Sequence, residues 1–509
     1  MDREHGDKRS RRNRPNAFYW QVDLVCEYLI YVILVFTPWA FGTTEDWSIQ
    51  TINILNYLLG GLLLTKWVYR LVNGFQPPRW DAPPALRGIN PKMVLIPLAV
   101  LTVVMLGYTA VAALNARADF IQEAQRFDYF QYKSWLPTSY DRSATWEAFQ
   151  RYLAIACFFW ALRDWLVTKT RREAKPDTDL EGEAAIGPEL AEAKGGYYSY
   201  DPTRFPTRLK RFLWVICANG ALLAIEGTLQ RLARSNSLLF IVDPTYNQSA
   251  VDQFGPYNYR TNGAQYLNMI WPIAVAFWWA LNQQGRKKLG EGVEFILMVF
   301  AALMAAAPPI SSSRGGLAIE VAQMVGVLVI FGYSFRRSGW WKTALVGGLF
   351  AVVLGSSIAL NWEGLQSRLT EGTLNTLSGR ATIYENSKKI VEDYPVWGTG
   401  PGSFGSVYQL YRSDPEQRWY AYAHDDYLQT MVTFGRVGFI GVMFMLVTVF
   451  AYWFLARGIP TSELFISFVW MAAAGCLLHA RFDFPLQIYS LQLLFVSICA
   501  IMTVLARRS

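Results

Sequence analysis

The chain has 509 residues, of which 52% are hydrophobic, 15% aromatic and 17% charged, and its formal net charge is +8. Soluble domains carry about 25% charged residues, whereas here the apolar residues gather into blocks of roughly 20, the length that an α-helix needs to cross a bilayer. This pattern excludes a soluble enzyme, a fibrous protein and a disordered chain, and it predicts no nucleic-acid partner, because the basic residues stand in short segments between apolar blocks.

Twelve apolar segments have the length and composition of a membrane-spanning helix. In chain order they are residues 22–41, 48–70, 93–114, 146–167, 211–230, 263–282, 292–309, 316–334, 343–361, 427–455, 462–479 and 487–506. The sequence therefore predicts an all-α polytopic membrane protein with about 12 transmembrane helices.

The distribution of Lys and Arg among the loops predicts the orientation, because short cytoplasmic loops are enriched in these residues. The short basic stretches at 286–288, 336–337 and 507–508 fall on the same side as the basic N-terminus. Both termini are therefore expected in the cytoplasm. The resulting order is a basic cytoplasmic N-terminus (1–21), the first four helices (22–167), a flexible cytoplasmic loop (168–210) and a transmembrane core (211–506).

Three loops on the opposite side are long: residues 115–145, 231–262 and 362–426. Long loops with structure of their own are usually functional. Residues 115–145 mix basic, acidic and aromatic side chains, a composition compatible with carbohydrate contact or with a simple cover over the bundle.

The loop 362–426 is predicted to be partly helical. Apolar side chains recur at helical spacing from Ile383 to Tyr394, which predicts an amphipathic helix that Pro395 ends. The segment Gly398–Phe404 that follows lacks the preceding strand of a phosphate-binding loop, so we interpret it as a tight turn that re-enters the bundle.

Spans that start on this outer side begin next to polar residues. Arg260 precedes the sixth segment, Arg314 the eighth and His424 the tenth. Helix N-termini present free N–H groups and a positive dipole end, which favour anions, and an Arg is a permanently charged fork of donors suited to a diphosphate. A helix start also favours a neutral imidazole, the form that a general base requires.

Further polar residues are expected near this set. They are Asp425, Asp426, Arg481 and Asp483. Each residue type also has an ordinary structural interpretation: an Arg at a membrane boundary often anchors the helix to lipid headgroups, and an Asp before a helix often serves only as its N-cap.

Taken together, these residues resemble the O-antigen ligase/polymerase family of bacterial inner-membrane proteins. The resemblance runs from about residue 210 to 490 and rests on five stretches in order: Gly255–Leu267, Ser313–Gly316, Gly379–Phe404, His424–Gly438 and His479–Pro485. It adds Arg380 and His479 to the supporting residues.

The resemblance implies a helical, lipid-phosphosugar-dependent glycosyltransferase that needs no metal and no cofactor. It would transfer a glycan from undecaprenyl diphosphate to an acceptor hydroxyl on the periplasmic side, inverting the anomeric centre. By this likeness Arg260 and Arg314 hold the diphosphate and His424 activates the acceptor. The partners would be the lipid-linked donor, a lipid or glycan acceptor and membrane lipids.

One departure from the family pattern concerns the residue after His424. The family commonly has Asn there, whereas this chain has Asp425, whose charge favours the protonated imidazole and so opposes the helix dipole.

Three other functions stay open at this point. A polymerase of lipid-linked repeat units would use the same chemistry with another acceptor. A transporter of anionic lipid-linked sugars would need charged residues near mid-span, and these are few, chiefly Glu27, Glu226 and Glu320. A membrane scaffold would have no use for the outer cationic residues.

Overall fold

The computed structural model describes residues 17–81, 88–173, 205–285, 292–335, 341–370, 373–413 and 419–507. Most of the predicted basic N-terminus (1–21) and of the predicted flexible loop (168–210) lies outside the described residues.

Within the described ranges, each of the twelve predicted segments coincides with a helix. These helices are α2 (Ala17–Trp39), α3 (Asp46–Asn73), α4 (Pro91–Leu114), α5 (Arg142–Val167), α7 (Thr207–Leu232), α8 (Arg260–Gly285), α9 (Ile296–Ile310), α10 (Arg314–Phe335), α11 (Trp341–Leu360), α15 (Asp426–Leu455), α16 (Glu463–His479) and α17 (Tyr489–Met502). Among the described residues, five helices (α2, α4, α7, α10 and α15) are long and apolar enough to cross a membrane. That all twelve cross it remains a prediction.

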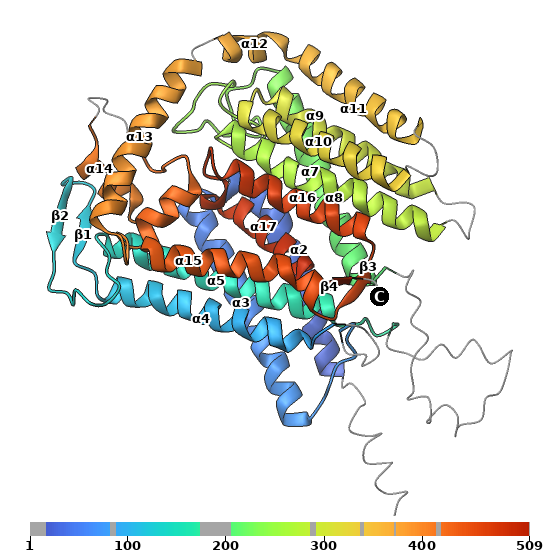
Figure 1. Cartoon of the computed structure of the whole chain (residues 1–509), viewed down its shortest axis with the longest axis horizontal. Helices are drawn as coiled ribbons and strands as arrows, with labels where there is room; N and C mark the ends of the chain where they lie inside the picture. The colour runs from blue at the N-terminus through green and yellow to red at the C-terminus, as the bar shows by residue number, and fades with distance from the viewer. Residues whose placement is uncertain are drawn as a thin grey trace, which may run out of the picture.

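Helix α8 lies inside the bundle (Figure 1), where it packs against α7, α9, α10 and α16. Residues 261–277 are all buried, as expected for a helix surrounded by other helices. Its polar side chains bind neighbouring helices: Asn268 Nδ2 donates to the Gly316 carbonyl of α10 at 2.9 Å. This central helix carries Arg260 at its first position.

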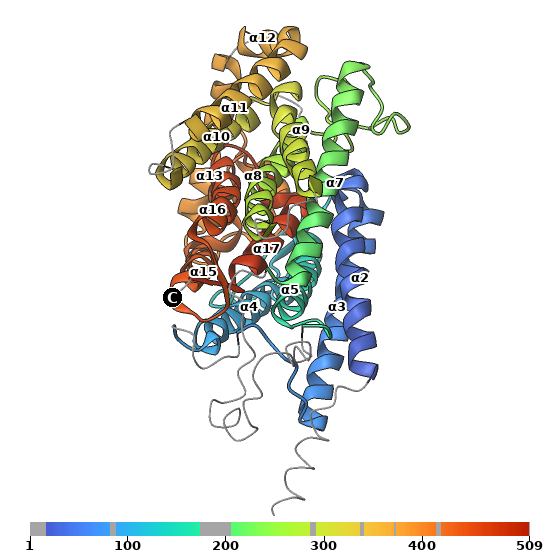
Figure 2. The same cartoon turned by 90° about the vertical axis from the view of Figure 1, so that its right-hand side faces the viewer.

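Other helices enclose this core. Figure 2 shows α2, α3 and α7 along one side of the molecule, and α2 contacts both α3 and α7. Near the C-terminus, β3 (Ile459–Thr461) pairs in parallel with β4 (Leu505–Arg507). The described residues also form the short 3-10 turns η1 (Phe41–Thr43), η3 (Gly292–Phe295) and η4 (Pro485–Gln487).

The opposite end of the bundle, which we call the α13 end, carries the structured loops. Strand β1 (Ala118–Ile121) pairs antiparallel with β2 (Arg126–Tyr129) in the first long loop. Helices α12 (Trp362–Thr370), α13 (Thr373–Asp393) and α14 (Phe404–Tyr411) lie in the third long loop. The β1–β2 hairpin lies beyond the ends of α4 and α5, beside α13 and α14 (Figure 1).

The predicted amphipathic helix is confirmed as part of α13. Ile383 and Ile390 are buried in an apolar cluster that also contains Tyr140, Phe404 and Val432, and the lysines at 388 and 389 are exposed. The helix therefore joins the hairpin to α14 and α15, with its charged face outward.

The predicted turn at Gly398–Phe404 is confirmed, and it fills a break in α15. Gly398, Gly400 and Gly402 all have positive φ, as does Gly435 within α15, a conformation that glycine adopts without strain. The break frees the Val432 and Thr433 carbonyls, which accept from the backbone N–H groups of Thr399 (2.8 Å) and Gly400 (3.0 Å). The turn thereby fixes the α13 end to α15.

At the other end of the bundle, buried charges bind one another. This paired-charge cluster consists of Asp23, Lys66, Arg70, Asp164 and Arg208. Lys66 Nζ lies 2.6 Å from Asp23 Oδ1 and 3.0 Å from Asp164 Oδ2, Arg70 binds both oxygens of Asp164, and Arg208 binds Asp23. These five residues stand near helix ends, so they do not alter the expectation that charged residues near mid-span are few, but nothing in the sequence indicates that they pair with one another.

Candidate active site

The centre of the site is a contact between His424 and Asp483. His424 Nδ1 lies 3.1 Å from Asp483 Oδ1, and the two side chains are 26% and 6% exposed. His424 has φ of 55° and lies two residues before α15, which begins at Asp426. His424 therefore precedes the helix, and the N-cap of α15 is Asp425. The contact fixes one ring nitrogen, while the imidazole keeps access to solvent.

Asp483 is held as a carboxylate by several donors. The Tyr259 hydroxyl donates to Oδ2 at 3.0 Å, and the Phe484 backbone N–H donates to Oδ1 at 3.1 Å. Burial favours the neutral acid, but the hydrogen bond from His424 and the electrostatic interactions with His424, His479 and Arg380 outweigh it, so the pKa of Asp483 is lowered. Asp483 therefore presents a fixed negative charge to His424 Nδ1.

Asp425 and Asp426 have structural partners of their own. Asp425 is the N-cap of α15, accepting from the N–H groups of Tyr427 and Leu428, and it forms an ion pair with Arg481. Burial raises the pKa of Asp425 against the opposing effects of these N–H groups and of Arg481. The acidic neighbour expected to act on His424 was Asp425, but the carboxylate that contacts the ring is Asp483.

Asp426 anchors the loop that carries Asp483. Its carboxylate accepts from Leu486 N–H at 2.9 Å and from Gln487 Nε2 at 2.8 Å. Its own N–H donates to the Ala480 carbonyl at 2.8 Å. These bonds attach the start of α15 to the α16–α17 connection, and they therefore hold His424 and Asp483 close to each other.

Aromatic rings pack beside the imidazole. Phe484 stacks on Tyr422 with centroids 4.3 Å apart and on Tyr259 with centroids 5.4 Å apart. The His424 ring meets Phe484 edge-on at 4.8 Å. The stack restricts the rotation of His424 and lines one wall of the site.

Arg260 and Arg314 are the first residues of α8 and α10, as predicted. The two helix starts touch, because Ser313 Oγ lies 3.3 Å from Thr261 Oγ1. Ser313 also caps α10 by accepting from Gly316 N–H at 3.0 Å. Arg260 is thus flanked by Tyr259, which contacts Asp483, and by Thr261, which contacts the residue before Arg314.

Arg260 has a carboxylate partner in the same loop. Its Nη1 lies 2.6 Å from Asp252 Oδ1 and 2.8 Å from the Val251 carbonyl oxygen. These contacts hold the guanidinium at the helix start, and they place a negative charge beside it that an incoming anion has to displace or tolerate.

The two glycines after Arg314 allow close packing of helices. A Cβ on Gly315 would lie 2.7 Å from His479 Nε2, and a Cβ on Gly316 would lie 2.7 Å from Ala264 Cβ. His479 is buried, with Nδ1 2.5 Å from Gln265 Oε1. His479 therefore packs behind the start of α10.

Helix α13 also reaches the site. Arg380 Nη1 donates to the Phe482 carbonyl at 2.8 Å, and the Tyr384 hydroxyl donates to the His424 carbonyl at 2.9 Å. These bonds connect the third long loop to both sides of the His424–Asp483 contact.

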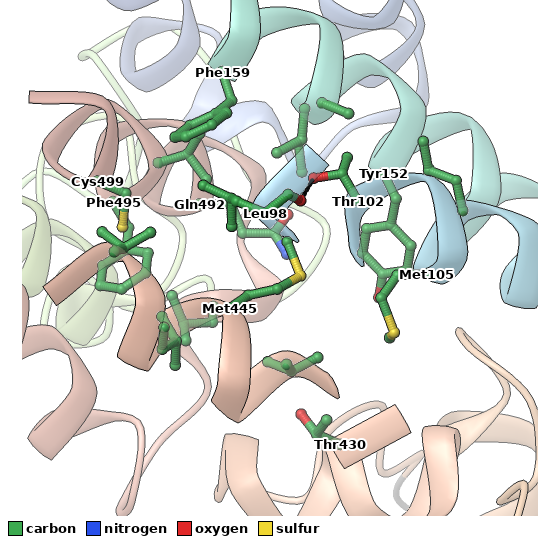
Figure 3. A pocket seen from close by; sticks show the side chains of 18 of the residues that line it. Leu98, Thr102, Met105, Tyr152, Phe159, Thr430, Met445, Gln492, Phe495 and Cys499 are labelled. Atoms are coloured by element: carbon green, nitrogen blue, oxygen red, sulfur yellow. Dashed lines mark hydrogen bonds between the residues drawn. The ribbon is translucent and has the colours of Figure 1, made fainter. Parts of the chain in front are cut away.

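An apolar cavity of about 320 Å³ lies between α4, α5, α15 and α17 (Figure 3). Its lining includes Leu98, Met105, Phe159, Met445 and Phe495. Asp426 and Gln487, which bind each other, also line it. The cavity and the His424 site therefore share residues.

Sequence reasoning missed Tyr259, Phe484 and Tyr422. The first two stand within stretches that carry the family resemblance, each next to a candidate site residue, so proximity in the chain was an available signal. Tyr422 stands two residues before His424, just outside the stretch that carries the resemblance, so the same proximity marked it as well.

Residues 299–443 match the family model described as O-antigen ligase. The match confirms the predicted family resemblance. It covers Arg314, Arg380 and His424, and it ends before His479. None of the curated proteins matches the chain. The family match and the apolar helices support a membrane protein that is similar to O-antigen ligases, and this similarity suggests a glycosyltransferase-like enzyme.

Proposed function

We propose that the protein transfers a glycan from undecaprenyl diphosphate to an acceptor hydroxyl on the periplasmic side of the bacterial inner membrane. The observation that carries the proposal is the His424–Asp483 pair, set beside two helix starts that each begin with an arginine. The family match over residues 299–443 gives independent support.

In the proposed reaction His424 is the general base. The Asp483 carboxylate accepts a hydrogen bond from the Nδ1–H group of His424, which leaves the unprotonated Nε2 free to accept a proton. Nε2 takes the proton of the acceptor hydroxyl while the oxygen of that hydroxyl bonds to the anomeric carbon of the donor. The bond from that carbon to the diphosphate oxygen breaks at the same time, and the single displacement inverts the centre.

Arg260 and Arg314 stabilise the departing diphosphate. Negative charge develops on the leaving oxygen, and fixed cations at helix N-termini meet it without reorganisation. A glycosyl diphosphate already carries a good leaving group, so these charges replace a metal ion.

The apolar cavity holds part of the polyprenyl chain. Its lining is apolar, as an isoprenoid chain requires, and Asp426 links it to the segment that carries His424. A chain lying between α4 and α15 would bring its diphosphate toward the α13 end, which the predicted topology places in the periplasm.

The test is transfer by the purified protein in lipid, with EDTA, from a polyprenyl-diphosphate glycan to separate candidate acceptors. Released polyprenyl diphosphate and product size are measured. One glycan moved to lipid A–core establishes a ligase, and a ladder built on the lipid carrier establishes a polymerase.

Arg314→Ala is compared with Arg234→Ala, an arginine whose side chain is 85% exposed. We expect Arg314→Ala to abolish release of the diphosphate and Arg234→Ala to preserve it. A requirement for metal, or full turnover by Arg314→Ala, would contradict the proposed mechanism.

A further inference from the structure

A stripe of buried polar side chains runs between α8 and α10. On α8, Thr261, Gln265 and Asn268 are spaced four and three residues apart and therefore share one face of the helix. All three are buried. On the α10 side the stripe continues with three further buried residues, and we call the whole set the buried polar stripe: Thr261, Gln265, Asn268, Ser313, Glu320 and Gln323.

The stripe joins the two helices along its length. Ser313 Oγ lies 3.3 Å from Thr261 Oγ1 at the helix starts. Further along, Asn268 Nδ2 donates to the Gly316 carbonyl at 2.9 Å, and Gln323 Nε2 donates to the Asn268 carbonyl at 3.1 Å. The face of α10 that carries Gly316 and Gln323 is therefore the face that packs against α8.

Glu320 lies on this same face of α10, one turn from each of these two residues. It follows Gly316 by four positions and precedes Gln323 by three, the spacing of neighbours on a helix. In an α-helix the Gly316 carbonyl also accepts the N–H group of Glu320, so the Asn268 amide that donates to this carbonyl lies beside Glu320. Glu320 is 0% exposed, and it forms no hydrogen bond or ion pair within the residues that the structure describes.

Two amide oxygens beside Glu320 lack donors as well. They are Asn268 Oδ1 and Gln323 Oε1, which are buried and accept no hydrogen bond from the described part of the chain. Each amide nitrogen already donates to a backbone carbonyl, so rotating either amide would break that bond. The contact between α8 and α10 therefore holds four buried oxygens that can only accept: two from the Glu320 carboxylate and one from each amide.

Such a set of oxygens suits a cation. A carboxylate between membrane helices is strongly destabilising unless a proton or a positive charge compensates it. Hard metal cations bind carboxylate and amide oxygens in place of water. One carboxylate and two neutral amides balance a single positive charge, which favours a monovalent ion. The close contact of the helices favours a small one, because a Cβ on Gly316 would lie 2.7 Å from Ala264 Cβ.

We propose that Glu320, Asn268 and Gln323 bind a small monovalent cation between α8 and α10. The carboxylate supplies the charge, and the two amides supply further oxygen ligands. The rest of the buried polar stripe leads to this site from the helix starts, where Thr261 and Ser313 lie.

The cation changes the charge behind the proposed diphosphate site. Glu320 stands six residues after Arg314, which is about 9 Å along the helix axis. A negative carboxylate at this distance opposes the binding of an anion at the start of α10, and a bound cation cancels its charge. The cation therefore strengthens donor binding, but turnover does not require it. This role rests on the proposed function, whereas the cation site itself does not.

The test measures equilibrium binding of radiolabelled Na⁺ to the full-length protein in phosphatidylcholine nanodiscs, with choline chloride to keep the ionic strength constant. We expect saturable binding by wild type. Glu320→Gln keeps the shape of the side chain but removes its charge, so it should lose about tenfold or more in affinity. The matched control is Glu226→Gln on α7, because both Glu226 carboxylate oxygens are also buried without a hydrogen-bond partner in the described ranges. Glu226→Gln should bind Na⁺ as wild type does.

Thermal unfolding shows whether the variants fold. Replacing choline chloride with NaCl should raise the melting temperature of wild type and of Glu226→Gln by a few degrees, because an ion that binds only the folded chain stabilises it. Glu320→Gln should not respond to NaCl. Without Na⁺ it should melt at or above the temperature of wild type, because it lacks the uncompensated charge. Absence of saturable binding by wild type, or equal binding by Glu320→Gln, would overturn the proposal.

Failure of this proposal is distinguishable from failure of the proposed function, because Na⁺ binding is measured without donor or acceptor. Saturable Na⁺ binding without any transfer would remove the proposed reaction alone. Transfer by a protein that binds no Na⁺ would remove the cation site alone. We expect the KM of wild type for the donor to be higher in choline chloride than in NaCl, and an equal KM would overturn the role assigned to the cation.

Discussion

The paired-charge cluster and the His424 site compensate their charges differently. In the cluster the Lys66 side chain is 1% exposed, and carboxylates lie on two sides of it. In the site the His424 side chain is 26% exposed and contacts one carboxylate, which itself is buried. Both regions join segments that are far apart in the chain.

This difference separates charges that hold helices together from charges that are available to a substrate. In the cluster, each charged group is buried or half-buried against an oppositely charged neighbour, so the ion pairs join α2, α3, α5 and α7. In the site, the buried partner Asp483 is saturated while the histidine keeps a nitrogen for another molecule. Partial exposure with a fixed partner is the feature expected of a general base.

The sharpest way to break this comparison is to remove the histidine. We expect His424→Ala to lower the transfer rate by about 10²–10⁴-fold, the usual contribution of a general base. The melting temperature should stay near that of wild type, because the side chain is partly exposed. Single-turnover assays with lipid-linked glycan give the rate. Retention of more than half the rate would remove His424 from the mechanism.

Removing a charge from the paired-charge cluster should lower the stability of the fold and leave the transfer rate unchanged. We expect Lys66→Met to destabilise the fold by about 3 kcal/mol, because Asp23 and Asp164 would lose a buried partner. The rate per folded molecule should not change. Thermal unfolding in detergent checks this, with Lys388→Met, on the exposed face of α13, as the control. A smaller loss on adding Asp23→Asn would show that unpaired charge is the cause.

Asp483 allows the comparison to be tested by pH. The pKa of Asp483 is lowered in the folded chain. Its ionised form therefore stabilises the fold fully above about pH 4, the ordinary pKa of an Asp in an unfolded chain. This stabilisation is lost as the pH falls through the lower pKa of the folded chain. Asp483→Asn should therefore cost about 1–3 kcal/mol at pH 7, and less below pH 4. Asp128→Asn is the control, because the Asp128 side chain on β2 is 46% exposed and its ion pair with Arg126 lies at the surface. A cost that stays constant with pH would contradict this account.

The apolar cavity gives the smallest expected effect. Ala156→Trp should occupy space between α4 and α5 and displace roughly two methylene groups of the polyprenyl chain, which raises KM about tenfold. A donor with a short isoprenoid chain should be unaffected. Val103→Trp, at an exposed position of α4, is the matched control. Equal KM changes for long and short donors would place the chain elsewhere.

The helices could be predicted because long apolar runs identify them directly. The start of α10 could be predicted as well, since Ser313 and the two glycines after Arg314 signal a cap and close packing. In each case the signal lies within a few neighbouring residues.

The partner of His424 could not be predicted, because three aspartates were candidates and spacing favoured the adjacent one. The positive φ of His424 and the capping role of Asp425 direct these adjacent side chains to different partners. Asp425 accepts from N–H groups of α15, whereas His424 contacts Asp483, which is 59 positions away in the chain. The paired-charge cluster was missed for a similar reason, since its members belong to four different helices.

The most direct test of the central distinction is to measure melting temperature and single-turnover rate side by side for wild type, His424→Ala and Lys66→Met. The account predicts a slow but stable His424→Ala and an unstable Lys66→Met with a normal rate per folded molecule. A transfer rate near that of wild type for His424→Ala would contradict the account. A large loss of transfer rate in folded Lys66→Met would contradict it as well.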